Sequence, residues 1–163
     1  MADYAYPWDA LISRLKFNDA LDLANALAQR VADVVDGAGG ARPHWVLPVP
    51  LSAQRLRERG YNQAWELARR VARSLGCKAD AKLLLRVKDT PHQLALPREQ
   101  RAANVRGAFL VEPRRTHELR GCDVAVVDDV MTTGATGAEI ARTLKQAGAH
   151  SVRLWVVART PSR

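Results

Sequence analysis

Cysteine is scarce in this chain, and the two residues present, Cys77 and Cys122, are isolated and far apart in the sequence. A cysteine-based metal site needs several ligands at short, regular spacings. Two isolated thiols cannot supply such a set, so we expect no zinc site. Lone cysteines of this kind behave as small apolar residues, and we expect both side chains to be buried.

Long apolar stretches are also missing. No hydrophobic run approaches the roughly 20 residues that a membrane-spanning helix requires. The opening sequence, MADYAYPWDALIS, lacks the basic region followed by an apolar core that marks a secretory signal. We therefore expect a cytoplasmic protein with no membrane span. The chain also shows no internal repeat and no low-complexity tract.

The composition is that of a globular protein, and its charge is unevenly distributed. Of the 163 residues, 47% are hydrophobic and 26% are charged, which favours one folded domain. The net charge is +8 overall, but residues 42–120 alone hold 17 basic and seven acidic residues, a net charge of +10. A basic middle segment predicts a polyanionic partner, either a phosphorylated ligand or nucleic acid.

Apolar segments of strand length alternate with amphipathic segments of helix length. The helices are expected at residues 18–36, 62–75 and 137–148, the last closed by Gly148 at its C-cap. Strands are expected at residues 44–50, 81–87, 108–111, 122–129 and 151–160. Between them, residues 88–107 are predicted to form a long polar loop. This alternation predicts an α/β fold with a mainly parallel, twisted sheet flanked by helices.

The stretch VAVVDDVMTTGATGAEI, residues 124–140, indicates a strand, an anion-binding turn and a helix start. The backbone amides of residues 133–137 have no acceptors earlier in the helix, so they can donate to an oxyanion. Gly134 and Gly137 permit unusual dihedral angles and leave room for a phosphate. Threonine hydroxyls and the helix dipole favour the same anion.

The two aspartates within this stretch, Asp128 and Asp129, need a different partner because carboxylates repel a phosphate. Ribose hydroxyls or a hydrated cation would suit them, and two adjacent residues at a strand end can hold one diol between them. The alternative interpretation is that Thr132 or Thr133 caps the helix while both aspartates lie in water.

These residues resemble a known motif. VVDDVMTTGATG is similar to the phosphoribosyl-pyrophosphate (PRPP) motif of type I phosphoribosyltransferases. The resemblance extends to the ComF family of phosphoribosyltransferase-like proteins, which are linked to bacterial competence. It is carried by YPWDALISRLKF, LPVPLSAQRLRERGYNQAWELAR, LLLRVKDTPHQLALPREQRAANVRGAF and VVDDVMTTGATGAEIARTLKQAGAHSVRLWVVAR. The resemblance implies one Rossmann-like phosphoribosyltransferase domain over residues 1–163, with a helical, hood-like segment at 1–40 and a PRPP-binding core at 41–163.

The resemblance also implies roles for particular residues. Asp128 and Asp129 would be the catalytic pair, holding the ribose hydroxyls directly or through the shell of a Mg²⁺ ion. The 5′-phosphate would be held by Thr132, Thr133, Gly134, Ala135 and Thr136. The pyrophosphate-binding loop would offer Leu51, Ser52, Arg55, Arg57 and Arg59. A flexible loop would offer Arg86, Lys88, Arg98 and Arg101. Arginine suits these positions because its planar fork can bind two phosphate oxygens. Alternatively, Arg57 and Arg59 are solvent-facing charges on a helix end.

Two family features are not expected. ComF-like proteins commonly carry a cysteine-rich, zinc-binding segment before the YPWD region, and this sequence begins just ahead of that region. No acceptor-binding signature can be recognised in the first 40 or so residues, which are the only candidates for a hood.

Three functions remain open from the sequence. The first is Mg²⁺-dependent transfer of the 5-phosphoribosyl group from PRPP to an acceptor that the sequence does not identify, with release of pyrophosphate. The second is non-catalytic binding of single-stranded DNA during DNA uptake. The basic middle segment favours it, but the chain lacks interleaved aromatic and basic residues for stacking bases. The third is PRPP sensing without turnover. The sequence also leaves open whether the protein assembles as a homodimer.

Overall fold

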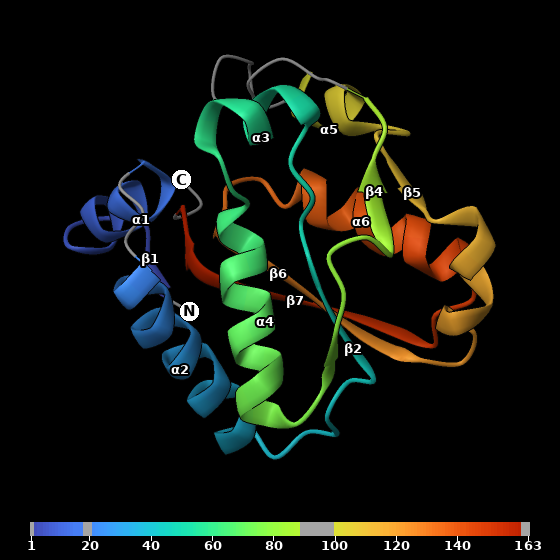
Figure 1. Ribbon diagram of the computed structural model, residues 1–163, viewed down its shortest axis with the longest axis horizontal. Coiled ribbons are helices and arrows are strands. Elements are labelled where there is room, and N and C mark those ends of the chain that lie inside the picture. The colour runs from blue at the N-terminus through green and yellow to red at the C-terminus, as the bar shows by residue number, and fades with distance from the viewer. Residues whose placement is uncertain (1, 18–20, 89–99, 161–163) are drawn as a thin grey trace.

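The computed structural model describes residues 2–17, 21–88 and 100–160 (Figure 1). Its centre is a five-stranded sheet in the order β1-β7-β6-β2-β3, and every neighbouring pair is parallel. The strands are β1 (Ala2–Asp3), β2 (Trp45–Pro48), β3 (Lys78–Ala79), β6 (Asp123–Met131) and β7 (Ser151–Arg159). The predicted α/β fold with a mainly parallel sheet is confirmed.

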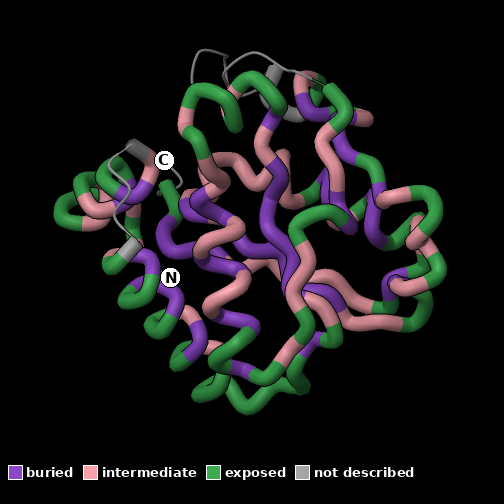
Figure 2. The backbone as a smooth tube through the Cα atoms, in the orientation of Figure 1, coloured by how far each residue is buried: buried purple, intermediate pink, exposed green. Residues whose placement is uncertain are grey.

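Helices cover both faces of this sheet. One face carries α1 (Trp8–Phe17), α2 (Leu21–Gly37) and α4 (Gln63–Leu75), and the other carries α6 (Ala135–Gln146). In Figure 1, α2 and α4 lie together to the left, and α6 lies to the right in orange. Figure 2 shows the buried residues concentrated between these layers, with exposed residues on the outer turns of the helices.

Strand β6 separates two hydrophobic clusters, because successive side chains of a strand point to opposite faces. Ala125 and Val127 pack with the α1, α2 and α4 side chains, whereas Val124 and Val126 pack with those of α6. All four are essentially inaccessible to solvent. This alternation continues to the end of the strand and decides where its polar residues point.

A second, antiparallel pair of strands lies outside the main sheet. It joins β4 (Leu84–Arg86) to β5 (Phe109–Val111), and it packs with α5 (Gln100–Val105) and the 3₁₀ helix η2 (Pro113–Leu119) on the α6 side. The strand expected at 81–87 is therefore present, but its partner is β5 and not the parallel sheet. The prediction of a continuous loop over 88–107 is wrong at α5; residues 89–99 lie outside the described part.

Local sequence explains the helix ends. The Asn62 side-chain oxygen accepts from the amides of Ala64 and Trp65, which starts α4, and Gly76 ends it in the left-handed region with φ of 68°. The predicted helices at 18–36 and 62–75 are confirmed within the described residues. Helix α6 begins two residues earlier than expected, and its C-cap is Ala147. Gly148 follows as the next residue, with φ of 100°.

Two expectations about the whole chain can be compared with this fold. Cys77 and Cys122 are free thiols, as expected, but both are half-buried and not fully buried. Across the described ranges, none of the helices combines the length and the apolar composition needed to cross a membrane.

Candidate functional site

A cavity of about 330 Å³ opens at the carboxyl ends of β2 and β6. Its walls are formed by the residues that follow β2, the end of β6, and the turn that leads into α6. Parallel pairing of β2 with β6, from Trp45 opposite Val124 to Pro48 opposite Val127, brings the two loops to the same edge of the sheet. Ligands of open parallel sheets bind at this edge. We call this cavity the cleft.

The two aspartates at the end of β6 both line the cleft, but they point to opposite faces of the strand. Asp129 continues the row of Val127 toward α1, and only 4% of its surface is exposed. Asp128 continues the row of Val126 toward α6 and is half-buried. The two neighbours therefore lie in different surroundings. The interpretation that both lie in water is wrong.

Lys16, near the end of α1, is the counter-charge of Asp129. Its Nζ lies 2.8 Å from Asp129 Oδ2, with 21% of the lysine side chain and 6% of the aspartate side chain exposed. Asp129 Oδ2 is buried, and apart from this ion pair it has no hydrogen-bond partner among the described residues. Burial opposes ionisation of Asp129, but the positive charge of Lys16 and hydrogen bonds to the carboxylate together outweigh it and lower the pKa of Asp129.

The neighbouring carboxylate has the opposite tendency. Burial and the negative charge of Asp129 raise the pKa of Asp128 well above its ordinary value. Its Oδ1 accepts a hydrogen bond of 2.9 Å from the backbone amide of Asp129. The strand end therefore holds one firmly ionised carboxylate and one that resists ionisation.

The turn after β6 is suited to an anion. Gly134 occupies the left-handed region with φ of 77° and is the N-cap of α6, so no side chain caps this helix start. Thr133 Oγ1 accepts from the amide of Ala135 at 3.4 Å, which supports the turn from inside. The first-turn amides and the positive end of the helix dipole face the cleft, where an oxyanion can use them. The alternative in which Thr132 or Thr133 is the cap is wrong.

Gly137 serves packing and not an unusual dihedral angle. Its φ is not positive, and a Cβ atom there would lie 2.6 Å from Leu154 Cδ2 of β7. The missing side chain lets α6 approach the sheet, which holds the turn at the strand ends. Of the two glycines expected to permit unusual dihedral angles, only Gly134 adopts one.

Three arginines line the cleft, two from α3 (Ala53–Arg59) and one from the end of β4. Burial, followed by the charge of Arg59, lowers the pKa of Arg55. Arg59 donates from Nη1 to Gln63 Oε1 at 3.0 Å, and Arg86 donates from Nε to the Lys88 carbonyl at 3.2 Å. The cleft therefore presents guanidinium groups, carboxylates and an anion-binding turn in one space.

The structure brings most of the predicted site residues to the cleft. Those that line it are Leu51, Arg55, Arg59, Arg86, Asp128, Asp129, Thr132, Gly134, Ala135 and Thr136. Thr133 does not line the cleft but supports its turn, and Ser52 is buried as the N-cap of α3, its Oγ accepting from the Arg55 amide at 3.4 Å.

The remaining predicted residues lie elsewhere. Arg57 is exposed away from the cleft, as the solvent-facing interpretation has it, and Lys88 lines a separate hollow beside Glu139. Arg98 is outside the described residues. Arg101 lies in α5, with its side chain outside the described part.

Sequence reasoning missed one wall of the cleft. Tyr4, Ser13 and Lys16, from the N-terminal segment, line it together with Gln63 of α4. No spacing along the chain indicates this, because the contacts join the beginning of the chain to the end of β6. Lys16 stands within the YPWDALISRLKF stretch, whose chemistry the sequence does not reveal.

The aspartates do not fit a directly coordinated Mg²⁺ ion. Carboxylate oxygens are suitable ligands, but Lys16 already neutralises Asp129. Within the described ranges, no three His, Cys, Asp or Glu residues come together as a candidate metal site. The residues fit a hydrated cation that arrives with the oxygens of its own ligand.

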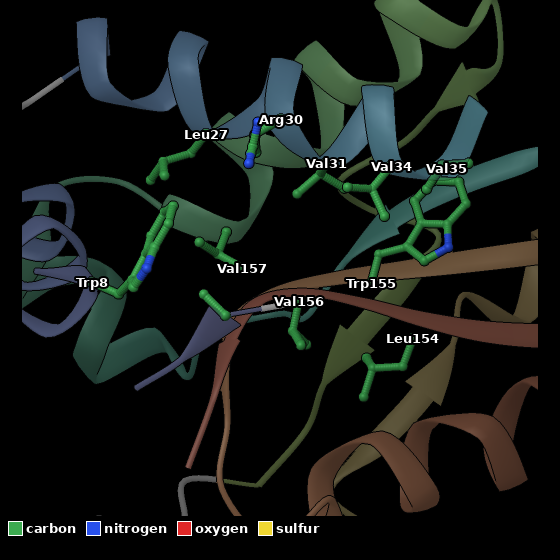
Figure 3. A pocket seen from close by; sticks show the side chains of 11 residues that line it. Trp8, Leu27, Arg30, Val31, Val34, Val35, Leu154, Trp155, Val156 and Val157 are labelled. Atoms are coloured by element: carbon green, nitrogen blue, oxygen red, sulfur yellow. The ribbon is translucent and has the colours of Figure 1, made fainter. Parts of the chain in front are cut away.

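A second cavity, of about 280 Å³, has different chemistry. It lies between α2 and β7, where Val31 and Val34 face Trp155 and Val157 (Figure 3). Arg30 is the one charged residue among its lining residues. With neither the aspartates nor the anion-binding turn, this cavity does not share the chemistry of the cleft.

Comparison with known sequences agrees with these observations. The phosphoribosyl transferase domain family matches residues 62–163. DNA utilization protein YhgH of Salmonella typhi is 36% identical, and the match covers 98% of this chain and 70% of that protein. YhgH of Escherichia coli strain K12 is 35% identical over the same shares. Competence protein F of Haemophilus influenzae is 34% identical, covering 96% of this chain and 69% of that protein.

Solved structures agree on the fold. The allosteric regulatory enzyme of purine biosynthesis and the glutamine PRPP amidotransferase of B. subtilis, solved with ADP and GMP, each match with a TM-score of 0.53. They are 19% and 18% identical, and each match covers 82% of this chain and 26% of the other. From the family match, the relatives and the fold, this chain belongs to the phosphoribosyl transferase domain family, as a ComF-like member of the type I phosphoribosyltransferases.

Proposed function

We propose that the cleft binds PRPP and that the protein transfers the 5-phosphoribosyl group to an acceptor, releasing pyrophosphate. One observation carries the proposal. A single cavity at the carboxyl ends of β2 and β6 gathers an anion-binding turn, two carboxylates and three arginines. These are three kinds of group for the three parts of PRPP, its phosphate, its ribose hydroxyls and its diphosphate.

The order of the groups in the cleft suggests how the ligand lies. The 5′-phosphate is assigned to the turn of residues 132–136, and the ribose hydroxyls to Asp128 and Asp129. The diphosphate is assigned to the β2–α3 side, where Arg55 and Arg59 line the cleft with the loop residue Leu51, and where Arg86 of β4 lines the same cavity. A ligand in this orientation places C1 of the ribose between the carboxylates and the arginines.

The proposed reaction needs charge stabilisation more than covalent help. A lone pair of the acceptor forms a bond to C1, and the bond from C1 to the diphosphate oxygen breaks with its electrons going to pyrophosphate. C1 becomes positively charged during the transfer, and the leaving group becomes more negative. The arginines stabilise the leaving group, and the carboxylates hold the ribose. When bound, Mg²⁺ would add charge neutralisation at the diphosphate.

Thermal unfolding with PRPP and Mg²⁺ tests the binding. A ligand that binds only the folded state at 100 times its Kd stabilises it by about 2.7 kcal/mol, so the Tm should rise clearly. Asp128→Asn/Asp129→Asn should remove the shift. Asp123→Asn is the matched control: it lies at the opposite end of β6, hydrogen-bonded to Ser151, and should keep the shift. No shift of the parent protein at millimolar PRPP would contradict the proposal.

The catalytic part needs its own measurement. Once binding is established by calorimetry, candidate acceptors are screened for release of pyrophosphate from PRPP. Release with one acceptor, abolished by the double aspartate variant, supports a transferase. Tight PRPP binding without release for any acceptor favours a PRPP sensor instead.

Single-stranded DNA is the second candidate ligand. The relatives named DNA utilization protein and competence protein F favour it, as does the net charge of +10 over residues 42–120. Binding through phosphates would weaken steeply as salt rises. Gel shifts with a single-stranded oligonucleotide across a salt series test this. Absence of a complex at low salt excludes it, and competition by PRPP would place the DNA at the cleft.

A further inference from the structure

Lys16 is held in the cleft by a firmly packed helix. Ile12 and Leu15 of α1 are fully buried, and the Tyr61 hydroxyl donates a hydrogen bond to the Leu15 carbonyl, next to the lysine. Ser13 of the same helix and Tyr4, just before it, also line the cleft. The ammonium group is therefore carried to Asp129 by fixed backbone and not by a freely moving surface side chain.

The ion pair lies at the ligand-facing end of β6. Asp129 is almost fully buried, and Lys16 keeps 21% of its side chain exposed, at the wall of the cleft. An ammonium group has three donor hydrogens, and the contact with Asp129 Oδ2 uses at most one of them. The others are available to oxygen atoms of a bound ligand.

Stability alone is a weak reason for this pair. Removing two charges from water costs roughly as much as their attraction returns, so buried ion pairs add little compared with apolar residues of similar size. A charged pair at this place is better explained by a ligand that needs an ionised carboxylate.

We propose that Lys16 is a positioning residue of the sugar site, where its ammonium group takes the place at Asp129 that a divalent cation would otherwise occupy. The inference rests on the proposed function and extends it: helix α1 forms a wall of the ribose-binding end, and the ribose hydroxyls bind Asp129 without a metal ion. A divalent cation at the same carboxylate would be repelled by the lysine. The Mg²⁺ that accompanies PRPP is then held on the diphosphate side.

Ribose 5-phosphate is the probe for this inference, because it carries the sugar and the phosphate but no diphosphate. Its binding is measured by calorimetry in Mg²⁺ and in EDTA. We expect the Kd of the parent protein to agree within about twofold between the two buffers. A tenfold weaker binding in EDTA would overturn the inference, and this comparison needs no variant.

Variants of Lys16 test the residue itself. Lys16→Met should weaken ribose 5-phosphate binding at least tenfold, and Lys16→Arg should recover most of the loss because it restores the positive charge. Arg14→Met is the matched control: Arg14 is exposed on the same helix, and its loss should leave the Kd unchanged. Equal affinity of Lys16→Met and the parent, or failure of Lys16→Arg to recover any binding, would overturn the inference.

The outcomes separate this inference from the proposed function. If the parent binds neither ribose 5-phosphate nor PRPP, both are wrong. If PRPP with Mg²⁺ binds while ribose 5-phosphate needs Mg²⁺ or does not bind, the proposed function stands and the inference about Lys16 is wrong.

Discussion

The two faces of β6 end in the same residue type but in different surroundings. Toward α1, Asp129 is buried against Lys16 and is held ionised. Toward α6, Asp128 is half-buried, resists ionisation, and leads into the anion-binding turn. The difference arises because adjacent residues of a strand face opposite layers, and only one of these layers supplies a cation.

This comparison shows that two like residues, adjacent in a motif, need not lie in equivalent surroundings. Asp129 both contacts α1 and lines the cleft, whereas Asp128 lines the cleft and contributes less to the stability of the fold. Their substitutions should therefore differ in stability even where they agree in ligand binding. The following predictions use that difference, beginning with the largest expected effect.

Asp129→Asn should destabilise the protein much more than Asp128→Asn. The first substitution leaves the Lys16 charge without its partner, at a cost of about 3 kcal/mol in the free energy of unfolding. The second should change that free energy by no more than about 1 kcal/mol, since Asp128 has more access to water. Urea unfolding at pH 8 measures both. Equal losses would show that the two faces do not differ in the way described.

Gly134→Ala should separate ligand binding from stability on the α6 side. Gly134 has φ of 77° and Gly121, remote from the cleft, has φ of 69°, so alanine at either position costs about 1–2 kcal/mol of backbone strain. Only Gly134→Ala should also weaken PRPP binding, because it distorts the turn. If both variants bind PRPP like the parent, the turn does not hold the phosphate.

Glu139→Gln should loosen α6 from the segment that precedes β5. Glu139 accepts a hydrogen bond from the Gly107 amide at 2.6 Å and pairs with Arg142. The variant should therefore lose about 1 kcal/mol in the free energy of unfolding. Hydrogen bonds from Arg142 lower the pKa of Glu139 from 4.5 to about 2. Its contribution is therefore present above pH 4.5 and is lost as the pH falls toward 2. Denaturation midpoints across that window should show the parent and variant converging.

The smallest effect concerns the pH dependence of Asp128. Because its pKa is raised in the folded state, the folded protein holds this proton more tightly than the unfolded chain does. The contribution of Asp128 to stability is therefore favourable at acid pH and is lost as the pH rises through the raised pKa. At pH 8, the free energy of unfolding of Asp128→Asn should equal that of the parent or exceed it by up to about 1 kcal/mol. This advantage should disappear on acidification. A difference in the free energy of unfolding between variant and parent that stays constant across the titration would contradict the raised pKa of Asp128.

Local patterns in the sequence were sufficient for much of the fold and for one side of the cleft. The period of apolar residues locates α2 and α4, and the β-branched run of β6 followed by acids, threonines and glycines locates the anion-binding turn. These features are encoded by neighbours along the chain, so they can be read without knowing what packs against them.

The remaining features depend on contacts between distant segments. The apolar run at 81–87 is compatible with either sheet, and only the structure shows that it pairs with β5. Gly137 could not be assigned to packing before Leu154 was known to lie beside it. Lys16 is an ordinary amphipathic-helix lysine until α1 is placed against the end of β6.

The attachment of β1 and α1 has a consequence for the order of folding. The segment with β1 and α1 is synthesised before β6 and β7, but β1 pairs with the end of β7, and Lys16 contacts the end of β6. Contacts between such distant parts of a chain form slowly, because a long loop must close before they return any energy. A nascent chain therefore carries α1 without its partner until the last two strands of the sheet have emerged from the ribosome. The α1 wall of the cleft is completed last, although its residues precede those of both strands in the sequence.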